Sequence, residues 1–276
     1  MSVERPWALV TGASSGIGRE FAVLLAERGY DLVLSARRGD RLNELAGELK
    51  QQHGANSRVI TADLSTPRGP EKLMAAVEMA NIPVEVLINN AGLGHYGEFI
   101  DQTVDQIDEV MTVNMRSATL LAHTFADRMK RQGGGHILWV GSFAGLQPVP
   151  RYAIYSATKT YAVALTYSLR YEFRKCGVKF SCLMPGFMET EFHEVSKHKK
   201  TKLMKWMTLD KTDVAKAGLK GMFGNKHVII PGAFYKLNAW LGRVLPKRLV
   251  TALSAAVVKN KDHKPGEGPR LMREAA

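Results

Sequence analysis

Short apolar runs alternate with amphipathic segments from the N-terminus to about residue 230. The runs are rich in Val, Leu and Ile, and they predict strands at 7–10, 31–35, 58–62, 84–88, 136–140, 178–184 and 228–230. Between them, apolar residues recur at helical spacing. This predicts helices at 16–28, 40–53, 71–79, 153–175 and 213–222, and two helical segments within 104–131. Such an alternation indicates an α/β fold, a doubly wound seven-stranded parallel sheet with helices on both faces.

A second pattern begins after the last predicted strand. The apolar face of a first amphipathic helix consists of Phe234, Leu237, Leu241, Val244 and Leu245, and that of a second, after Pro246, of Leu249, Val250, Leu253 and Val257. We therefore expect a main domain at 1–232 and a C-terminal amphipathic helical extension at 233–276, which ends in a polar tail. Two interpretations of these faces stay open. They pack on the protein body or a partner subunit, or they lie in a lipid interface.

Composition places this chain among folded globular proteins. It has 276 residues, of which 45% are apolar and 23% are charged. Its two cysteines cannot form a disulfide framework, and no Cys or His spacing fits a metal site, so we expect no metal. The sequence contains no signal-peptide pattern and no apolar run long enough to span a membrane. Together with unpaired cysteines, this predicts a cytoplasmic protein.

The positive charge is concentrated toward the C-terminus. Residues 197–276 hold 18 Lys and Arg against 5 Asp and Glu, a balance of 18 − 5 = +13, whereas residues 1–196 hold 20 against 21, or −1. Such a segment either attracts an anionic partner, such as a phosphorylated ligand, an acyl carrier or an anionic lipid surface, or is a solvated basic face. No known module indicates a nucleic-acid partner, and we expect none.

A glycine-rich turn connects the first predicted strand to the first predicted helix. It reads Thr11-Gly-Ala-Ser-Ser-Gly-Ile-Gly18. Small residues allow backbone N–H groups to approach a pyrophosphate at a helix N-terminus, so the turn indicates a dinucleotide site. The candidate cofactor-binding residues in this turn are Gly12, Ser14, Ser15, Gly16, Ile17 and Gly18.

Two arginines follow the second predicted strand. An NAD-binding protein usually has an acidic residue here for the ribose 2′-hydroxyl, whereas this chain has Arg37 and Arg38. A guanidinium matches a 2′-phosphate, so we expect NADP(H) rather than NAD. After the third strand, Asp63, followed by Leu64, is a candidate for the adenine amino group; the alternative is that Asp63 caps a helix or turn.

A possible proton-transfer group lies in the second half of the chain. Tyr155 and Lys159 share one face of a predicted helix, and Ser142 follows the fifth predicted strand, at the sheet edge where ligands bind. A nearby ammonium favours the phenolate, and a hydroxyl can hold a carbonyl oxygen. Together with Asn114, these residues form a plausible acid–base device beside a hydride carrier.

These motifs, in this order and spacing, resemble those of the short-chain dehydrogenase/reductase family over about residues 6–231. The matching segments are Thr11-Gly12-x-x-x-Gly16-x-Gly18, Asn89-Asn90-Ala91-Gly92, Asn114, Ser142, Tyr155-x-x-x-Lys159 and Pro185-Gly186-x-x-x-Thr190. The resemblance implies a Rossmann-type sheet of order 3-2-1-4-5-6-7 and makes residues 1–232 a dinucleotide-binding catalytic domain.

The resemblance also implies roles for individual residues. Tyr155 would be the catalytic acid, Lys159 would lower its pKa and bind the nicotinamide ribose, Ser142 would orient the substrate oxygen, and Asn114 would hold a water. Further cofactor-binding positions would be Asn90, Ala91, Gly92, Pro185, Gly186 and Thr190. Substrate would contact Leu93, Ala144, Tyr152 and Phe187 besides Ser142 and Tyr155, under a lid at about 187–212.

We therefore expect an NADP(H)-dependent oxidoreductase that reduces the carbonyl of a lipophilic small molecule to an alcohol, or catalyses the reverse reaction. We also expect a homodimer. Two alternatives remain: a peripheral membrane enzyme of lipid or steroid metabolism, with lipid contact through the C-terminal extension, and an NADP-binding regulator without turnover.

Overall fold

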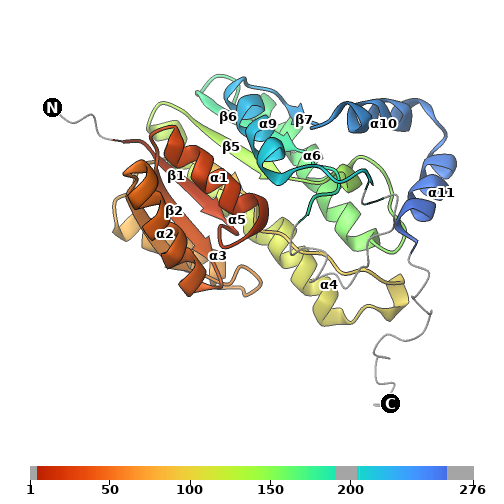
Figure 1. The fold of residues 1–276 in the computed structure, drawn as a ribbon, viewed down its shortest axis with the longest axis horizontal. Coiled ribbons are helices and arrows are strands. Elements are labelled where there is room, and N and C mark those ends of the chain that lie inside the picture. The colour runs from red at the N-terminus through yellow and green to blue at the C-terminus, as the bar shows by residue number, and fades with distance from the viewer. Residues whose placement is uncertain (1–4, 190–203, 205, 260–276) are drawn as a thin grey trace, which may run out of the picture.

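The computed structural model describes residues 5–189, 204 and 206–259. Its centre is a parallel sheet of seven strands in the order β3-β2-β1-β4-β5-β6-β7 (Figure 1). The strands are β1 Trp7–Thr11, β2 Asp31–Ala36, β3 Ser57–Thr61, β4 Val84–Asn89, β5 Gly135–Val140, β6 Val178–Leu183 and β7 Val228–Ile229. The expected fold class and strand order are both confirmed.

Helices cover both faces of the sheet, because successive strand residues point to opposite sides. Ala8 and Val10 of β1 pack with the first layer, whereas Leu9 between them packs with the second. The first layer comprises α1 (Gly16–Glu27), α2 (Gly39–His53) and α9 (Lys211–Phe223). The second comprises α3 (Gly69–Met79), α5 (Ala118–Arg131) and α6 (Ala153–Glu172). The central strands β1 and β4 are therefore mostly buried, and the carboxyl ends of the strands are where ligands bind in such sheets.

The two helical segments predicted within 104–131 form one continuous helical stretch that is irregular in its middle. It consists of α4 (Val104–Met111), a π-helical turn at Thr112–Ser117, and α5. Thr103 begins α4 with a capping box, in which its hydroxyl accepts the Gln106 N–H and the Gln106 side chain accepts the Thr103 N–H. Asn114 lies in the π-helical turn, and such turns frequently occur at functional sites. Two short 3₁₀ turns occupy Phe99–Asp101 and Phe143–Gly145.

The C-terminal extension forms α10 (Ala233–Val244) and α11 (Lys247–Val258), at the opposite end of the molecule from α2 (Figure 1). Each helix buries one side: Tyr235 and Gly242 on α10, and Val250, Ser254 and Val258 on α11. The Ser254 hydroxyl donates to the Pro148 carbonyl at 2.6 Å. The expected apolar faces are thus only partly used in packing on the protein body. Within the described part of the chain, no helix has the length and hydrophobicity to cross a membrane.

Candidate active site

One cavity of about 690 Å³ runs along the carboxyl ends of β1 to β6. It collects most of the residues that the sequence suggested for cofactor and substrate. Those in its lining are Gly12, Ser14, Ser15, Gly16, Ile17, Gly18, Arg37, Arg38, Asp63, Leu64, Asn90, Ala91, Gly92, Leu93, Ser142, Ala144, Tyr152, Tyr155, Lys159, Pro185, Gly186 and Phe187. Thr190 and most of the expected lid at 187–212 lie outside the described residues.

The glycine-rich turn is tight because its backbone segments touch. Gly12 adopts φ +66°, a conformation that favours glycine. A Cβ on Gly18 would lie 2.3 Å from the Gly12 carbonyl oxygen, so no larger residue fits there. The turn feeds directly into the N-terminus of α1, where backbone N–H groups and the helix dipole favour a phosphate. This end of the cavity therefore fits the pyrophosphate of a dinucleotide.

Asn90 and Thr11 hold this turn against the end of β4. The Asn90 amide donates to the carbonyls of Thr11 at 2.8 Å and Gly12 at 3.3 Å. The Thr11 hydroxyl accepts the backbone N–H groups of Asn90 and Ala91, each at 3.0 Å. The Asn-Asn-Ala-Gly motif thus has a structural explanation that the spacing alone did not reveal: it fixes the shape of the glycine-rich turn.

The two arginines after β2 have different surroundings. The Arg38 guanidinium donates to the hydroxyls of Ser15 at 2.9 Å and Ser14 at 3.2 Å, and so lies across the glycine-rich turn. Arg37 instead lies 3.8 Å from a carboxylate oxygen of Glu109. Both line the cavity where the adenosine half of a dinucleotide would lie. Asp63 caps a turn, because its Oδ1 accepts both the N–H and the hydroxyl of Ser65.

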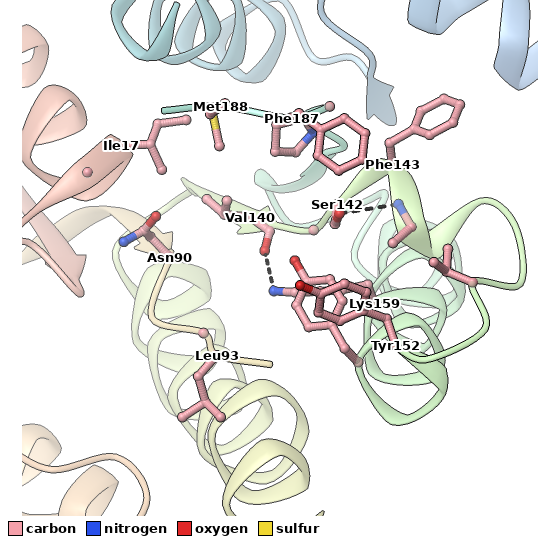
Figure 2. A pocket seen from close by; sticks show the side chains of 18 of the residues that line it. Ile17, Asn90, Leu93, Val140, Ser142, Phe143, Tyr152, Lys159, Phe187 and Met188 are labelled. Carbon is pink, nitrogen blue, oxygen red and sulfur yellow. Dashed lines mark hydrogen bonds between the residues drawn. The ribbon is translucent and has the colours of Figure 1, made fainter. Parts of the chain in front are cut away.

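Ser142, Tyr155 and Lys159 all line the cavity. Figure 2 shows Ser142 and Lys159, with the hydrogen bond from Lys159 to Val140 dashed. Lys159 is buried, and its ammonium donates to the carbonyl of Val140, the last residue of β5, at 2.9 Å. Its Nζ lies 5.6 Å from the centre of the Tyr155 ring. Ser142 follows β5, forms a hydrogen bond with Tyr155, and accepts the Ala144 N–H at 3.2 Å. The end of β5 and the helix α6 therefore hold the Ser142 hydroxyl, the Tyr155 phenol and the Lys159 ammonium close together.

Burial changes the acidity of Tyr155 and Lys159 in opposite directions. It raises the pKa of Tyr155 to about 12, although the hydrogen bond with Ser142 acts to lower it. It lowers the pKa of Lys159 to about 8. The resemblance implied a lowered pKa for Tyr155, whereas in this structure the effect of burial is larger than that of the hydrogen bond with Ser142. Tyr155 is therefore protonated at neutral pH, as a proton donor must be.

Asn114 stands behind the cavity rather than in its lining. Its amide donates to the Leu93 carbonyl at 2.8 Å and to the Thr158 hydroxyl at 3.0 Å, and its Oδ1 accepts the Leu93 N–H at 3.0 Å. It thus connects the π-helical turn both to the loop after β4 and to α6. That it also holds a water stays a prediction.

The far end of the cavity is apolar and aromatic. Tyr152 is buried and packs against Tyr155, with ring centres 5.9 Å apart, while Val257 and Val258 of α11 lie beside it. Sequence reasoning did not assign the extension to the site. The extension residues in the lining are Phe234, Tyr235, Asn238, Leu241, Gly242, Leu245, Val250, Leu253, Ser254, Val257 and Val258. Their helical periodicity was visible, but nothing local indicates which surface a helix meets.

The sequence and the fold of this chain are similar to those of known dehydrogenases and reductases. The family model described as short chain dehydrogenase matches residues 6–201. A very-long-chain 3-oxoacyl-CoA reductase of Anas platyrhynchos is 29% identical over 252 residues, which cover 90% of this chain and 78% of that protein. A solved short-chain dehydrogenase from Sphingobium yanoikuyae, in complex with NADPH, is 30% identical with a TM-score of 0.77, covering 97% of this chain and 100% of that one. The bulky-bulky ketone specific alcohol dehydrogenase from Comamonas testosteroni is 28% identical with a TM-score of 0.74, covering 89% and 96%.

The matched region contains the glycine-rich turn, Ser142, Tyr155 and Lys159, and the sheet order is the one that this family's motifs imply. The chain is thus an oxidoreductase that uses a nicotinamide cofactor and acts on hydroxyl or carbonyl groups. It belongs to the short-chain dehydrogenase family.

Proposed function

We propose that this protein is an NADP(H)-dependent reductase of lipophilic ketones, with Tyr155 as the acid–base residue. The observation that carries the proposal is the convergence of Ser142, Tyr155 and Lys159 between a dinucleotide-shaped groove and an apolar chamber. The cofactor, when bound, supplies the hydride. Ser142 and Tyr155 hold the carbonyl oxygen, and the Tyr155 hydroxyl donates its proton to that oxygen as the alcohol forms. Lys159 stabilises the resulting phenolate.

Arg38 and Arg37 support the choice of NADP over NAD. Both guanidiniums line the adenosine end of the cavity, and Arg38 is oriented by the two serine hydroxyls of the glycine-rich turn. Such a pre-oriented guanidinium can form charge-assisted hydrogen bonds to a 2′-phosphate. No acidic residue stands at the end of β2, at Ala36 to Arg38, to favour a free 2′-hydroxyl.

The apolar chamber supports a lipophilic substrate. Its walls combine Tyr152 and Phe187 with the inner sides of α10 and α11, and so present a mostly apolar surface to the reacting carbonyl. Two relatives have names that fit such a substrate, a very-long-chain 3-oxoacyl-CoA reductase and a dehydrogenase specific for bulky-bulky ketones. In this view residues 1–232 form the dinucleotide-binding catalytic domain, and the extension shapes the substrate end.

The test is NADPH oxidation over carbonyl compounds that span 3-oxoacyl thioesters, steroid ketones, aromatic ketones and sugars, with NADH in parallel. We expect turnover with NADPH on apolar ketones, and a loss of about 10²–10⁴-fold in kcat for Tyr155→Phe. Retained NADPH binding in that variant is the control for folding. Binding of NADPH without turnover of any compound would contradict the proposal and favour a cofactor-sensing regulator.

We also propose a homodimer that assembles through the two long helices α5 and α6. Light scattering of the full chain in solution measures the subunit number directly. A monomeric mass at micromolar concentration would refute the dimer without affecting the catalytic proposal.

A further inference from the structure

The outer sides of α10 and α11 expose large apolar side chains. Leu237, Trp240 and Val244 on α10 and Leu249 and Leu253 on α11 are all exposed; Trp240 retains 57% and Val244 61% of its accessible surface. Trp206 lies beside α10, with its ring centre 5.6 Å from that of Phe234, and is itself 72% exposed. We call these six residues, Trp206, Leu237, Trp240, Val244, Leu249 and Leu253, the outer apolar face.

Helical geometry arranges α10 in three parallel rows. Leu237, Trp240 and Val244 form the middle row, which faces solvent. Phe234, Leu241 and Leu245 form the row on one side, and these three line the cavity. Lys236 and Arg243 form the row on the other side, and both are exposed. The outer apolar face thus lies between the cavity and a basic edge.

The charge of the extension has one sign. From Ala233 to Lys259 the chain contains Lys236, Arg243, Lys247, Arg248 and Lys259, and no Asp or Glu. All five cations are exposed. Exposed aromatic and leucine side chains edged by cations, with no anion among them, match the boundary between the acyl chains and the headgroups of an anionic bilayer.

The outer apolar face is also continuous with the cavity. Leu253 of this face is part of the cavity lining, and Trp206 packs on Phe234, which is itself exposed and part of the lining. A lipophilic molecule dissolved in a bilayer could therefore pass from the acyl chains into the chamber without crossing water.

From these observations we infer that the outer apolar face docks the protein on an anionic lipid surface, with the cavity rim against the membrane. This goes beyond the proposed reaction, because it names the surface on which the enzyme works. A second copy of this chain is a poorer occupant. In a two-fold symmetric dimer the same patch meets itself, and because all charged residues of 233–259 are cations, such a dimer would bring like charges together.

The experiment uses the full chain and vesicles of phosphatidylcholine with and without 30% phosphatidylglycerol. Binding is measured by flotation and by the blue shift of tryptophan emission, to which Trp206 and Trp240 contribute. We expect binding to the anionic vesicles at least tenfold tighter than to neutral ones, and weakening with added salt.

Two variants separate the apolar from the charged contribution. Leu237→Gln/Trp240→Gln/Leu249→Gln alters residues that are absent from the cavity lining, so NADPH-dependent turnover of a small water-soluble ketone remains, while vesicle binding falls more than tenfold. Arg243→Gln/Lys247→Gln/Arg248→Gln lowers affinity for anionic vesicles on the order of a hundredfold. The control, Met79→Gln/Ile100→Gln, removes even more exposed apolar side chains from another surface and leaves binding unchanged.

Three results would overturn the inference: no vesicle binding by the full chain, equal loss in the Met79/Ile100 control, or a dimer in light scattering that dissociates in the triple apolar variant. The last result would identify a second copy as the occupant. Vesicle binding requires no turnover, so failure of the proposed reaction and failure of lipid docking are distinguishable.

Discussion

Tyr155 and Lys159 lie one helical turn apart on α6, yet the protein interior shifts their acidity in opposite senses. Each shift favours the uncharged form, because burial removes both groups from water. A phenol with a pKa of about 12 is a proton donor at every physiological pH. An amine with a pKa of about 8 is cationic at neutral pH and loses its charge just above it.

The pKa values predict different pH profiles for the two directions. For reduction, kcat/KM stays flat from about pH 6 to about 8 and falls above, where Lys159 loses the charge that stabilises the phenolate. For oxidation, kcat/KM rises with pH, since Tyr155 must first lose its proton. Initial rates in both directions across this range test the prediction. A reduction rate that falls already below pH 7 would contradict it.

The two arginines after β2 have different hydrogen-bond and ion-pair partners. This difference predicts different effects of their substitution on the KM for the cofactor. Arg38→Ala removes the guanidinium that the Ser14 and Ser15 hydroxyls orient, so the KM for NADPH rises about tenfold to a hundredfold while that for NADH is unchanged. Arg37→Ala has a smaller effect, because the Arg37 guanidinium already lies beside the Glu109 carboxylate. Steady-state kinetics of both variants with NADPH and with NADH measures these changes in KM. Equal losses for NADPH and NADH would mean that Arg38 supports the turn rather than selecting the phosphate.

At the scale of elements, one side chain joins α10 to the segment after β6. The Tyr235 hydroxyl accepts the Phe187 N–H and donates to the Met207 carbonyl, each at 2.9 Å, and so bridges both ends of the expected lid. Its ring lies directly on Gly186, where a Cβ would come within 1.9 Å of it. Gly186 of the Pro-Gly turn is thus required for the docking of α10.

Loss of the Tyr235 hydroxyl leaves two backbone groups without this partner. We therefore expect Tyr235→Phe to lower the free energy of unfolding by about 1–3 kcal/mol, as measured by urea denaturation, and to raise the KM for ketones. The matched control is Tyr171→Phe, at an exposed position on α6, which changes neither quantity. An unchanged KM together with lowered stability would show that the bridge only supports the fold.

For the molecule as a whole, the extension makes the substrate end of the cavity larger and more apolar than the sheet edge alone would. α10 contributes to two surfaces at once, since neighbouring residues point in different directions. Leu245 lines the cavity, whereas Val244 belongs to the outer apolar face. The proposed substrate selection and the proposed lipid docking therefore involve adjacent rows of one helix.

This division predicts the outcome of a matched pair of substitutions. Leu245→Trp fills part of the chamber and lowers kcat/KM for bulky ketones at least tenfold, while that for small ketones is retained. Val244→Trp, one residue earlier, leaves both values unchanged because its side chain points outward. A comparison of the two variants on one large and one small ketone tests this. Equal loss on both ketones would show that Leu245 supports folding rather than shaping the chamber.

The order of the strands was implied by the family resemblance of the motifs. The residues by themselves determined the parallel sheet, the glycine-rich turn and the shared face of Tyr155 and Lys159. Each of these depends on local spacing: a period of two or 3.6 residues, or small residues at one strand end. The place of Ser142 in the site could also be predicted from the sequence, because the strands of a parallel sheet end at a common edge.

The tertiary structure alone decided the remaining features. It placed Asn114 behind the cavity and gave Arg38 and Arg37 different hydrogen-bond and ion-pair partners. It also raised the pKa of Tyr155 through burial. It also divided the apolar residues of α10 between the chamber and the outer surface. These features depend on which distant segments meet and how much water they exclude. Helical periodicity shows that a face is apolar, but only packing determines what covers it.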